Sequence, residues 1–308
     1  MEPIEVQSLS KDYGHGRGVF HVSLSVHEGE VFGFLGPNGA GKSTTIRHLM
    51  GFSKPDEGQA LLFGRKAFEN YADVMNRVGY LPGEIALPAG LTGWDFIDMM
   101  KKLRGTDCDE NTQRLMRMFD LDPSGETKRM SLGVKRKLAV VTAFMHDPDV
   151  LILDEPTSGL DIVMQETFID FIKEEKRRGK TILLSSHIFS EVDATCDRIA
   201  IIKDGRIVSD FIADDLRHNS NKNYDLIFTD QAAFDTFAEE NQNNPHFRIV
   251  EKNREALQLL VNVDDAQINA LIRKMCGSGI LEFHHRRETL EEYFMQYYKE
   301  DMHFGGVV

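Results

Sequence analysis

The sequence predicts an α/β protein whose core is a mostly parallel sheet with an antiparallel N-terminal β-subdomain and a helical insert, followed by a small α+β C-terminal domain. Three observations support this fold class. A glycine-rich segment at 33–49 lies between a strand-like and a helical pattern. Strand-like and helical segments alternate between residues 150 and 208. The polar stretch 217–223 separates off the last part of the chain.

The N-terminal part of the chain shows the alternation of apolar and polar residues that is typical of antiparallel strands. Residues 4–9 and 19–26 alternate in this way and are bounded by glycine-containing turns. The apolar stretch 30–35 predicts a buried strand that leads into the glycine-rich segment. After Ser43, apolar residues recur three or four positions apart, which predicts a helix directly behind that segment.

The middle of this region changes to helical patterns. Segments 94–105, 112–122 and 134–146 each carry apolar residues at helical spacing. We therefore predict a helical subdomain at about 88–147.

Strand patterns return after the insert. Segments 149–156, 180–187 and 198–208 are strand-like, and an amphipathic helix at 163–179 connects the first two. Because strands joined through helices run parallel, the sheet should be largely parallel, with helices on both faces.

A second domain is predicted to follow the polar stretch "RHNSNKN", so the predicted domains are 1–217 and 218–308. Beyond this stretch the patterns run strand, helix, strand, strand, helix, strand, which is compatible with a β-α-β-β-α-β unit. A final helix then presents one apolar and aromatic face. This face consists of Leu290, Tyr293, Phe294 and Tyr297. It either packs within its own small domain or contacts another part of the protein, and the sequence leaves both possibilities open.

Composition limits the classes of protein to which the chain can belong. The 308 residues carry a net charge of −13, with a sequence pI near 5.3, which gives no diffuse attraction to nucleic acid or anionic lipid. Cys108, Cys196 and Cys276 are far apart and in no metal-ligand spacing, so we expect free thiols in a reducing compartment. The N-terminus lacks a basic segment followed by an apolar core, and the most apolar stretch is broken by charged residues. We expect no leader peptide and no membrane span.

The glycine-rich segment contains a phosphate-binding motif. Residues 36–43 fit the pattern G-x-x-x-x-G-K-[ST], in which glycines free the backbone N–H groups to converge on phosphate oxygens at a helix N-terminus. The strand before it and the helix after it give the expected context, so the motif predicts a P-loop NTPase core with a bound nucleotide. The predicted nucleotide-binding residues are Gly36, Pro37, Asn38, Gly39, Ala40, Gly41, Lys42, Ser43 and Thr44.

Two carboxylates and a histidine follow strand-like segments. Asp154 and Glu155 end the strand "VLILD": the first suits a Mg²⁺ site together with Ser43, and the second can polarise the attacking water. His187 follows the strand "LLSS", which should place it at the same edge of a parallel sheet, close to the γ-phosphate. Taken alone, the carboxylates could lie in a solvated turn and His187 could be a structural hydrogen bonder. The phosphate-binding motif favours the functional interpretation, in which Lys42, Glu155 and His187 are catalytic.

The order of these motifs resembles that of ABC-transporter ATPases. The segment "MSLGVKRKL" precedes "LILDEP", and "SGLD" follows it directly. The family carries its phosphate loop, signature loop, acidic strand end, "SGLD"-type loop and switch histidine in this order, and the match spans residues 4 to about 215. The stretch "SLGVK" is similar to the family signature, usually LSGGQ, and more closely to the variant of drug and antibiotic exporter subunits with leucine in place of the first glycine.

The resemblance implies a dimer that sandwiches two ATP molecules, each between the phosphate loop of one subunit and Ser131 and Gly133 of the other. These residues offer a hydroxyl and an unhindered N–H at a helix N-terminus. An ordinary helix cap is the alternative. Tyr13 matches the aromatic residue that stacks on adenine, although it could simply be a surface tyrosine in a turn. Asp161 matches the loop that touches the opposite subunit.

One position departs from the family. Relatives carry a glutamine after the strand "GYLP", where it joins the Mg²⁺ shell, whereas this chain has Gly83 and then Glu84. Either Glu84 takes over as a metal ligand, or water fills the position. Downstream, Trp94 lies where the helical subdomain of the family receives the permease, and packing in the core is the other interpretation.

The hypothesis that follows is the ATP-hydrolysing, nucleotide-binding subunit of an ABC transporter, an exporter that uses ATP and Mg²⁺. It would be cytoplasmic and peripheral at the inner face of the cell membrane, where it binds separate membrane permease subunits. A second ATPase subunit, identical or different, would complete the dimer, and no nucleic acid is expected as a partner. The alternative is a soluble ABC ATPase that acts on nucleic acid or the ribosome, which the acidic charge, the single ATPase unit and the lack of a heptad run disfavour. A regulator that binds nucleotide without turnover is disfavoured by Glu155.

Overall fold

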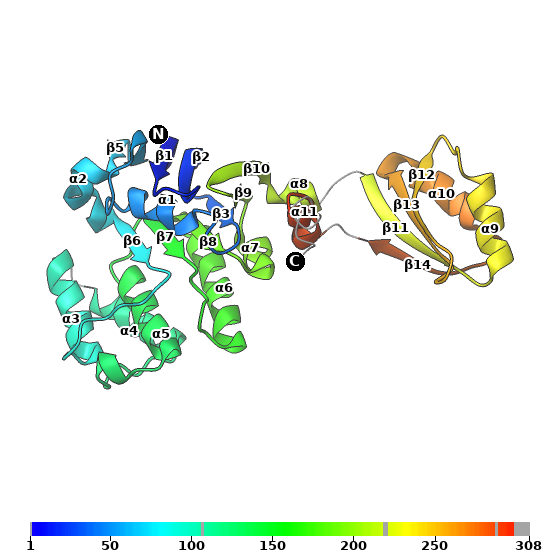
Figure 1. The fold of residues 1–308 in the computed structure, drawn as a ribbon. Coiled ribbons are helices and arrows are strands. Elements are labelled where there is room, and N and C mark those ends of the chain that lie inside the picture. The colour runs from blue at the N-terminus through cyan, green and yellow to red at the C-terminus, as the bar shows by residue number, and fades with distance from the viewer. Residues whose placement is uncertain (1, 106–107, 218–220, 287–288, 299–308) are drawn as a thin grey trace, which may run out of the picture. The chain divides into compact units, whose positions relative to one another are not determined.

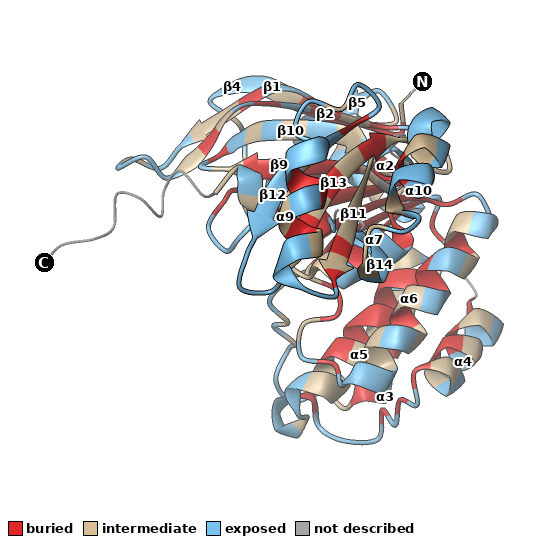
Figure 2. Ribbon diagram, turned by 90° about the vertical axis from the view of Figure 1, so that its right-hand side faces the viewer, coloured by how far each residue is buried: buried red, intermediate tan, exposed pale blue. Residues whose placement is uncertain are grey.

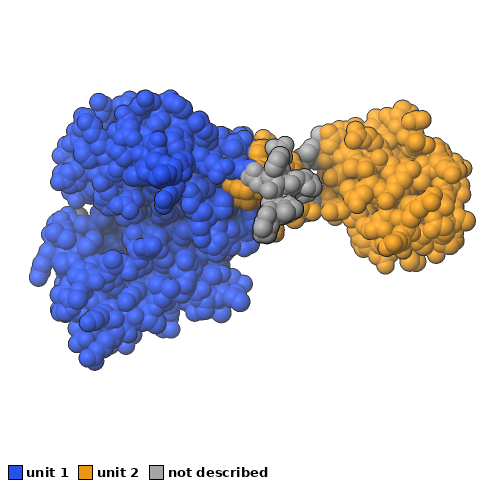
Figure 3. All heavy atoms as spheres, in the orientation of Figure 1, with its two compact units in different colours: residues 1–213 blue, residues 214–308 orange. Residues whose placement is uncertain are grey.

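The computed structural model contains two compact units, residues 1–213 and 214–308, which are shown in different colours in Figure 3. The described residues are 2–105, 108–217, 221–286 and 289–298. The sequence places the domain boundary at residue 217, the last residue of the short helix α8 (Ala213–Arg217). Residues 218–220 of the polar stretch, and the end of the predicted final helix at 299–300, lie outside the described residues.

The first unit is built on a six-stranded sheet with the strand order β10-β9-β3-β8-β7-β6 (Figure 1). Its strands are β3 (Val31–Leu35), β6 (Val78–Leu81), β7 (Val150–Asp154), β8 (Thr181–Ser186), β9 (Arg198–Lys203) and β10 (Arg206–Ile212). All neighbouring pairs are parallel except β9 and β10. Every residue of β3, β7 and β8 is buried, as expected for parallel strands covered on both faces. The predicted mostly parallel sheet is confirmed.

A second sheet of four antiparallel strands packs beside it, in the order β2-β1-β4-β5. Its strands are β1 (Ile4–Asp12), β2 (Gly18–Val26), β4 (Glu57–Leu62) and β5 (Arg65–Lys66). Helix α1 (Lys42–Leu49) contacts both sheets and buries Ile46 and Leu49 in the core that they share. The predicted antiparallel subdomain is confirmed. The sequence patterns predict no element at 57–77, where β4 and β5 are followed by α2 (Ala67–Val74) and the 3-10 helix η1 (Met75–Arg77).

The helical insert consists of α3 (Gly93–Arg104), α4 (Asp109–Met118), the 3-10 helix η2 (Thr127–Arg129) and α5 (Leu132–Phe144). Helices α6 (Ile162–Arg177) and α7 (Phe189–Thr195) follow β7 and β8. Figure 2 shows buried residues in the central parts of α5 and α6. Within the described residues, no helix has the length and apolar character needed to cross a bilayer.

The second unit is built on an antiparallel sheet with the strand order β12-β13-β11-β14. Its elements are β11 (Asn221–Phe228), α9 (Gln231–Glu240), β12 (Phe247–Asn253), β13 (Gln258–Asp264), η3 (Asp265–Gln267), α10 (Ile268–Met275), β14 (Ile280–Arg286) and α11 (Leu290–Gln296). Residues of α9 and α10 share one apolar core with one face of the sheet. This is the element order that the sequence predicts. In α11, Leu290 and Phe294 are buried.

Candidate active site

The phosphate-binding loop connects β3 to α1, at the carboxyl edge of the parallel sheet. Gly41 caps the helix with a φ of 115°, a conformation that favours glycine. At Gly36 a Cβ atom would lie 2.6 Å from the carbonyl oxygen of Ile202, so a larger residue would displace the loop. Residues 37–39 between them are exposed. The loop therefore leaves the first N–H groups of α1, which have no partner inside a helix, facing an accessible surface that suits an anion.

Lys42 lies over this loop. It is only 5% exposed, and its Nζ donates hydrogen bonds to the carbonyl oxygens of Gly36 (2.5 Å) and Pro37 (3.2 Å). The same Nζ forms an ion pair with Oε1 of Glu155 at 3.0 Å. The lysine is thus held at the loop next to the predicted general base.

Glu155 lies between Lys42 and His187. Its Oε2 is 2.6 Å from Nδ1 of His187. Glu155 adopts a φ of 49°, a region that non-glycine residues seldom occupy, and its N–H donates to the carbonyl oxygen of Ser185 at 3.0 Å. Strand β8 therefore fixes the position of Glu155. The three residues that the sequence predicts to be catalytic lie together, at the edge where the strands end.

Asp154, the last residue of β7, is buried and accepts a hydrogen bond from the Ser185 hydroxyl at 2.5 Å. Gly83 approaches it closely, because a Cβ atom on Gly83 would be 3.1 Å from Oδ2 of Asp154. Ser43 is exposed at the start of α1, and Glu84 is exposed beside Gly83. Carboxylate and hydroxyl oxygens are ligands that Mg²⁺ prefers, so Ser43 and Asp154 are suited to that ion. A metal-binding role for Glu84 stays a prediction.

A second group of predicted residues lies at the starts of α5 and α6. Ser131 caps α5 by accepting a hydrogen bond from the N–H of Val134 at 3.3 Å. Asp161 caps α6 through a bond from the N–H of Met164 at 3.0 Å. A Cβ atom on Gly133 would lie 3.3 Å from the carbonyl oxygen of Gly159, so the signature segment packs against the "SGLD" segment. Within one chain these side chains act as helix caps, and their contact with ATP stays a prediction.

Tyr13 lies in the turn that follows β1. Its side chain is exposed, and its backbone N–H donates to the carbonyl oxygen of Arg17 at 2.8 Å. The ring is accessible for stacking, and stacking on adenine stays a prediction.

Four buried polar residues at this site are not among those predicted from the sequence. Arg136, on α5, donates to three backbone carbonyl oxygens of two loops. Ser185 donates to Asp154, and Ser186 donates to Glu191 at 2.6 Å. Burial raises the pKa of Glu191 to about 7. The available signals were polar residues in apolar patterns: a basic residue on the apolar face of the 134–146 helix, and two serines ending an apolar strand.

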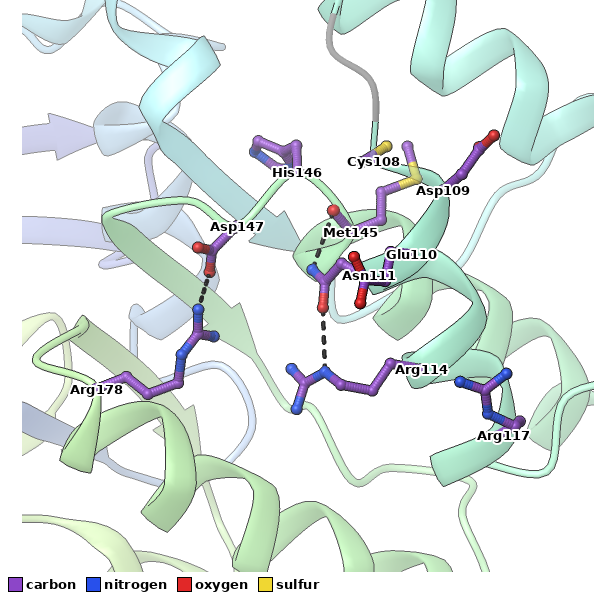
Figure 4. Close-up of a pocket in the computed structure, with 10 residues that line it drawn as sticks. All are labelled: Cys108, Asp109, Glu110, Asn111, Arg114, Arg117, Met145, His146, Asp147 and Arg178. Atoms are coloured by element: carbon purple, nitrogen blue, oxygen red, sulfur yellow. Dashed lines mark hydrogen bonds and ion pairs between the residues drawn. The ribbon is translucent and has the colours of Figure 1, made fainter.

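The large cavity in Figure 4 is a different place. Its volume is about 860 Å³, and it borders Asp147 and Arg178, which precede β7 and β8 and therefore mark the amino edge of the parallel sheet. Figure 4 shows Arg178 directed at Asp147, at 2.8 Å, and Arg114 pairs with Glu174 at 3.0 Å. This cavity therefore lies at the edge of the sheet opposite the phosphate-binding loop, and its arginines Arg114 and Arg178 are paired with carboxylates.

Comparisons with known proteins agree with the geometry. Residues 19–158 match the family described as ABC transporter. The chain is 35% identical to the bacitracin transport ATP-binding protein BcrA of Bacillus licheniformis over 233 residues, which cover 74% of this chain and 76% of that protein. It is 36% identical to the probable multidrug ABC transporter ATP-binding protein YbhF of Escherichia coli (strain K12), covering 70% of this chain and 38% of that protein.

A solved structure described as the ATP-binding subunit of an ABC transporter is similar to the chain with a TM-score of 0.64 and 31% sequence identity. The similarity covers 70% of this chain and 91% of that chain. The family match at residues 19–158 includes the phosphate-binding loop and the paired carboxylates. The chain belongs to the ATP-binding subunits of ABC transporters and is an ABC-type ATPase.

Proposed function

We propose that the chain hydrolyses ATP with Mg²⁺ at Lys42, Glu155 and His187, as one of two ATPase subunits that drive an exporter. The observation that carries this proposal is the placement of Glu155, with one carboxylate oxygen 3.0 Å from Nζ of Lys42 and the other 2.6 Å from Nδ1 of His187. A base so placed lies beside the loop that binds the phosphates.

Binding of ATP begins with competition for Lys42. The γ-phosphate and Glu155 are both anions, and each can pair with the ammonium group of Lys42. Phosphate oxygens can also accept hydrogen bonds from the N–H groups at the start of α1, whereas the carboxylate of Glu155 has no such bond among the described residues. When the phosphate replaces Glu155 as the partner of Lys42, the carboxylate is released to contact water.

Ser43 and Asp154 would hold the magnesium ion. Asp154 is a buried carboxylate with one oxygen fixed by Ser185, and Ser43 presents a hydroxyl at the start of the same helix that receives the phosphates. When bound, the ion would offset part of the negative charge of the nucleotide phosphates. Gly83 offers no side-chain ligand beside Asp154.

Hydrolysis then depends on Glu155 and His187. A water attacks the γ-phosphorus as Glu155 accepts its proton, and the bond to the β–γ bridging oxygen breaks to give ADP and phosphate. His187, whose Nδ1 lies 2.6 Å from Glu155, would donate a hydrogen bond to a γ-phosphate oxygen. A donor at this position stabilises the negative charge that develops on the phosphate.

Dimer formation is the second part of the proposal. Ser131 and Asp161 each adjoin exposed apolar side chains, namely Leu132, Ile162 and Val163, of which Ile162 is 75% exposed. Apolar side chains grouped beside polar caps support an interface with a second ATPase subunit. In that dimer Ser131 and Gly133 would face the γ-phosphate held by the other subunit.

A mixing experiment tests this arrangement. Lys42→Ala and Gly133→Asp are each purified, and ATP-dependent dimerisation is measured alone and in a mixture by size-exclusion chromatography. The mixture should form dimers that neither variant forms, because one of its two interfaces pairs a sound phosphate loop with a sound signature. If two folded variants give no dimer on mixing, the signature segment is only a helix cap.

Transport in the export direction is supported by the relatives, whose names describe bacitracin and multidrug transport.

The proposal of permease partners is supported by exposed aromatic side chains of the first unit, Phe52, Tyr71 and Trp94. Trp94 is 45% exposed, which supports a contact surface more than packing in the core. The chain would lie in the cytoplasm at the inner face of the membrane through these subunits. Purification of the native complex should recover a membrane subunit, and recovery of ribosomes instead would favour the soluble alternative, which the net charge of −13 opposes.

A further inference from the structure

We propose that Arg136 is a positioning residue that ties the signature segment to the metal-binding carboxylate, a role that rests on the ATPase function proposed above. It would make the start of α5, the Gly83 segment and the loop after Glu155 move as one body when ATP closes the dimer.

The contacts of Arg136 reach two separate loops. From α5, Nη1 donates to the carbonyl oxygen of Pro82 at 2.9 Å and Nη2 to that of Gly83 at 2.7 Å. Nε donates to the carbonyl oxygen of Ser158 at 2.9 Å. The planar guanidinium fork thus binds three backbone acceptors at once, and the side chain is only 1% exposed.

Each loop leads to a part of the hydrolytic site. Gly83 lies against Asp154, because a Cβ atom added to Gly83 would be 3.1 Å from Oδ2 of Asp154. With no side chain of its own, Gly83 owes this position to its backbone, which Arg136 holds. Ser158 belongs to the loop between Glu155 and Asp161. A displacement of the signature helix is therefore transmitted to both carboxylates through one side chain.

The charge of Arg136 supports the same role. Burial lowers the pKa of Arg136 from its ordinary value, and the carboxylates of Asp154, Glu155 and Glu191 act in the opposite direction. The guanidinium is thus a buried cation whose charge these carboxylates favour. Removing it would leave three carbonyl oxygens without their donor and the carboxylates without that charge.

Because of these contacts, Arg136 should affect turnover more than nucleotide binding. Arg136 donates to the protein backbone, whereas the loop at 36–44 is built to hold the phosphates. We therefore expect variants of Arg136 to change kcat and dimer closure more than the KM for ATP. Lysine keeps the charge but lacks the fork, and glutamine removes the charge and leaves one donor group.

The test compares Arg136→Lys and Arg136→Gln with the parent protein in steady-state ATPase assays. We expect kcat to fall by roughly 10–100-fold in Arg136→Gln, the range seen when groups behind metal ligands are lost, with the KM for ATP unchanged. Arg136→Lys should recover part of this loss. In a Glu155→Gln background, ATP-dependent dimerisation should need a higher protein concentration with either substitution.

Arg104 provides a matched control. It also donates to two backbone carbonyls, of Met75 (2.8 Å) and Val78 (3.2 Å), but Val78 begins β6 at the amino edge of the sheet. Arg104→Gln should lower the melting temperature and leave kcat close to that of the parent. If the Arg136 variants lose only thermal stability and keep kcat, the inference is wrong. If the parent shows no Glu155-dependent ATP hydrolysis, the proposed function fails instead.

Discussion

Replacement of Ser185 by alanine removes the only side-chain donor that the structure records on Asp154 within the described residues. The Ser185 hydroxyl is 2.5 Å from Oδ1 of Asp154, and both side chains are buried. A hydrogen bond to a buried charged group contributes about 1.5–3 kcal/mol, so the free energy of unfolding should fall by about that amount. Denaturant unfolding of the two proteins measures this loss.

The same substitution should weaken magnesium binding. Ser185 fixes the orientation of the carboxylate that would hold the ion, and loss of such a supporting hydrogen bond typically costs 10–100-fold in metal affinity. This corresponds to about 1.4–2.7 kcal/mol. The ATPase rate is measured against Mg²⁺ concentration at saturating ATP. The Mg²⁺ concentration at half-maximal rate, the magnesium midpoint, should be about 10-fold higher or more in Ser185→Ala than in the parent.

Ser186 is the matched control, because it is equally buried and donates to Glu191 at 2.6 Å instead. Ser186→Ala should lose a similar amount of stability and keep the magnesium midpoint of the parent. Equal midpoints for Ser185→Ala and the parent would refute the argument that Ser185 orients a metal ligand.

Three further predictions follow from burial and close contact. Burial raises the pKa of Glu191 from 4.5 to about 7. Between these two pH values the Glu191 carboxyl is protonated in the folded state but not in the unfolded state. The free energy of unfolding should therefore fall by up to about 3 kcal/mol as the pH rises from 4.5 to about 7. Glu191→Gln should flatten this dependence in unfolding measured from pH 5 to 8 (about the window of the shift), and an unchanged slope would exclude Glu191 as its source. Gly83→Ala should raise the Mg²⁺ concentration that gives half of the maximal ATPase rate, because the added Cβ would crowd the carboxylate of Asp154. An unchanged Mg²⁺ concentration at half-maximal rate would mean that Asp154 moves aside without losing affinity for the ion. Truncation after residue 217 should leave ATP affinity intact by titration, because the phosphate loop and its partners lie in the first unit; a folded truncated protein that no longer binds ATP would contradict this.

Much of the site was predictable because its signals are local. The phosphate loop is contiguous in the sequence, and the rule that parallel strands end at one edge brings Glu155 and His187 beside it.

Two elements outside the site could not be predicted. The strand β5 has two residues and the helix α2 is interrupted at Asn70, so both have too little periodicity to be recognised.

Local patterns mark the supporting residues only as polar residues in apolar surroundings, and their partners depend on tertiary contacts. In the sequence Arg136 is one basic residue among several on a helix, and its role appears only when Gly83 and Ser158 are brought to it. The stretch "LLSSH" predicts a buried strand, but only the pairing of Asp154 with Ser185 decides which serine supports the carboxylate.

Glu155 would be the base for ATP hydrolysis, at a site whose lysine also holds the nucleotide. Its role is tested by the ATPase rate of Glu155→Gln with Mg²⁺, measured together with ATP binding by the same protein. We expect a rate at least ~10²-fold below that of the parent, because a positioned base contributes about that much or more, while ATP still binds and drives dimer formation. Near-normal hydrolysis by the folded variant would show that Glu155 is not the base.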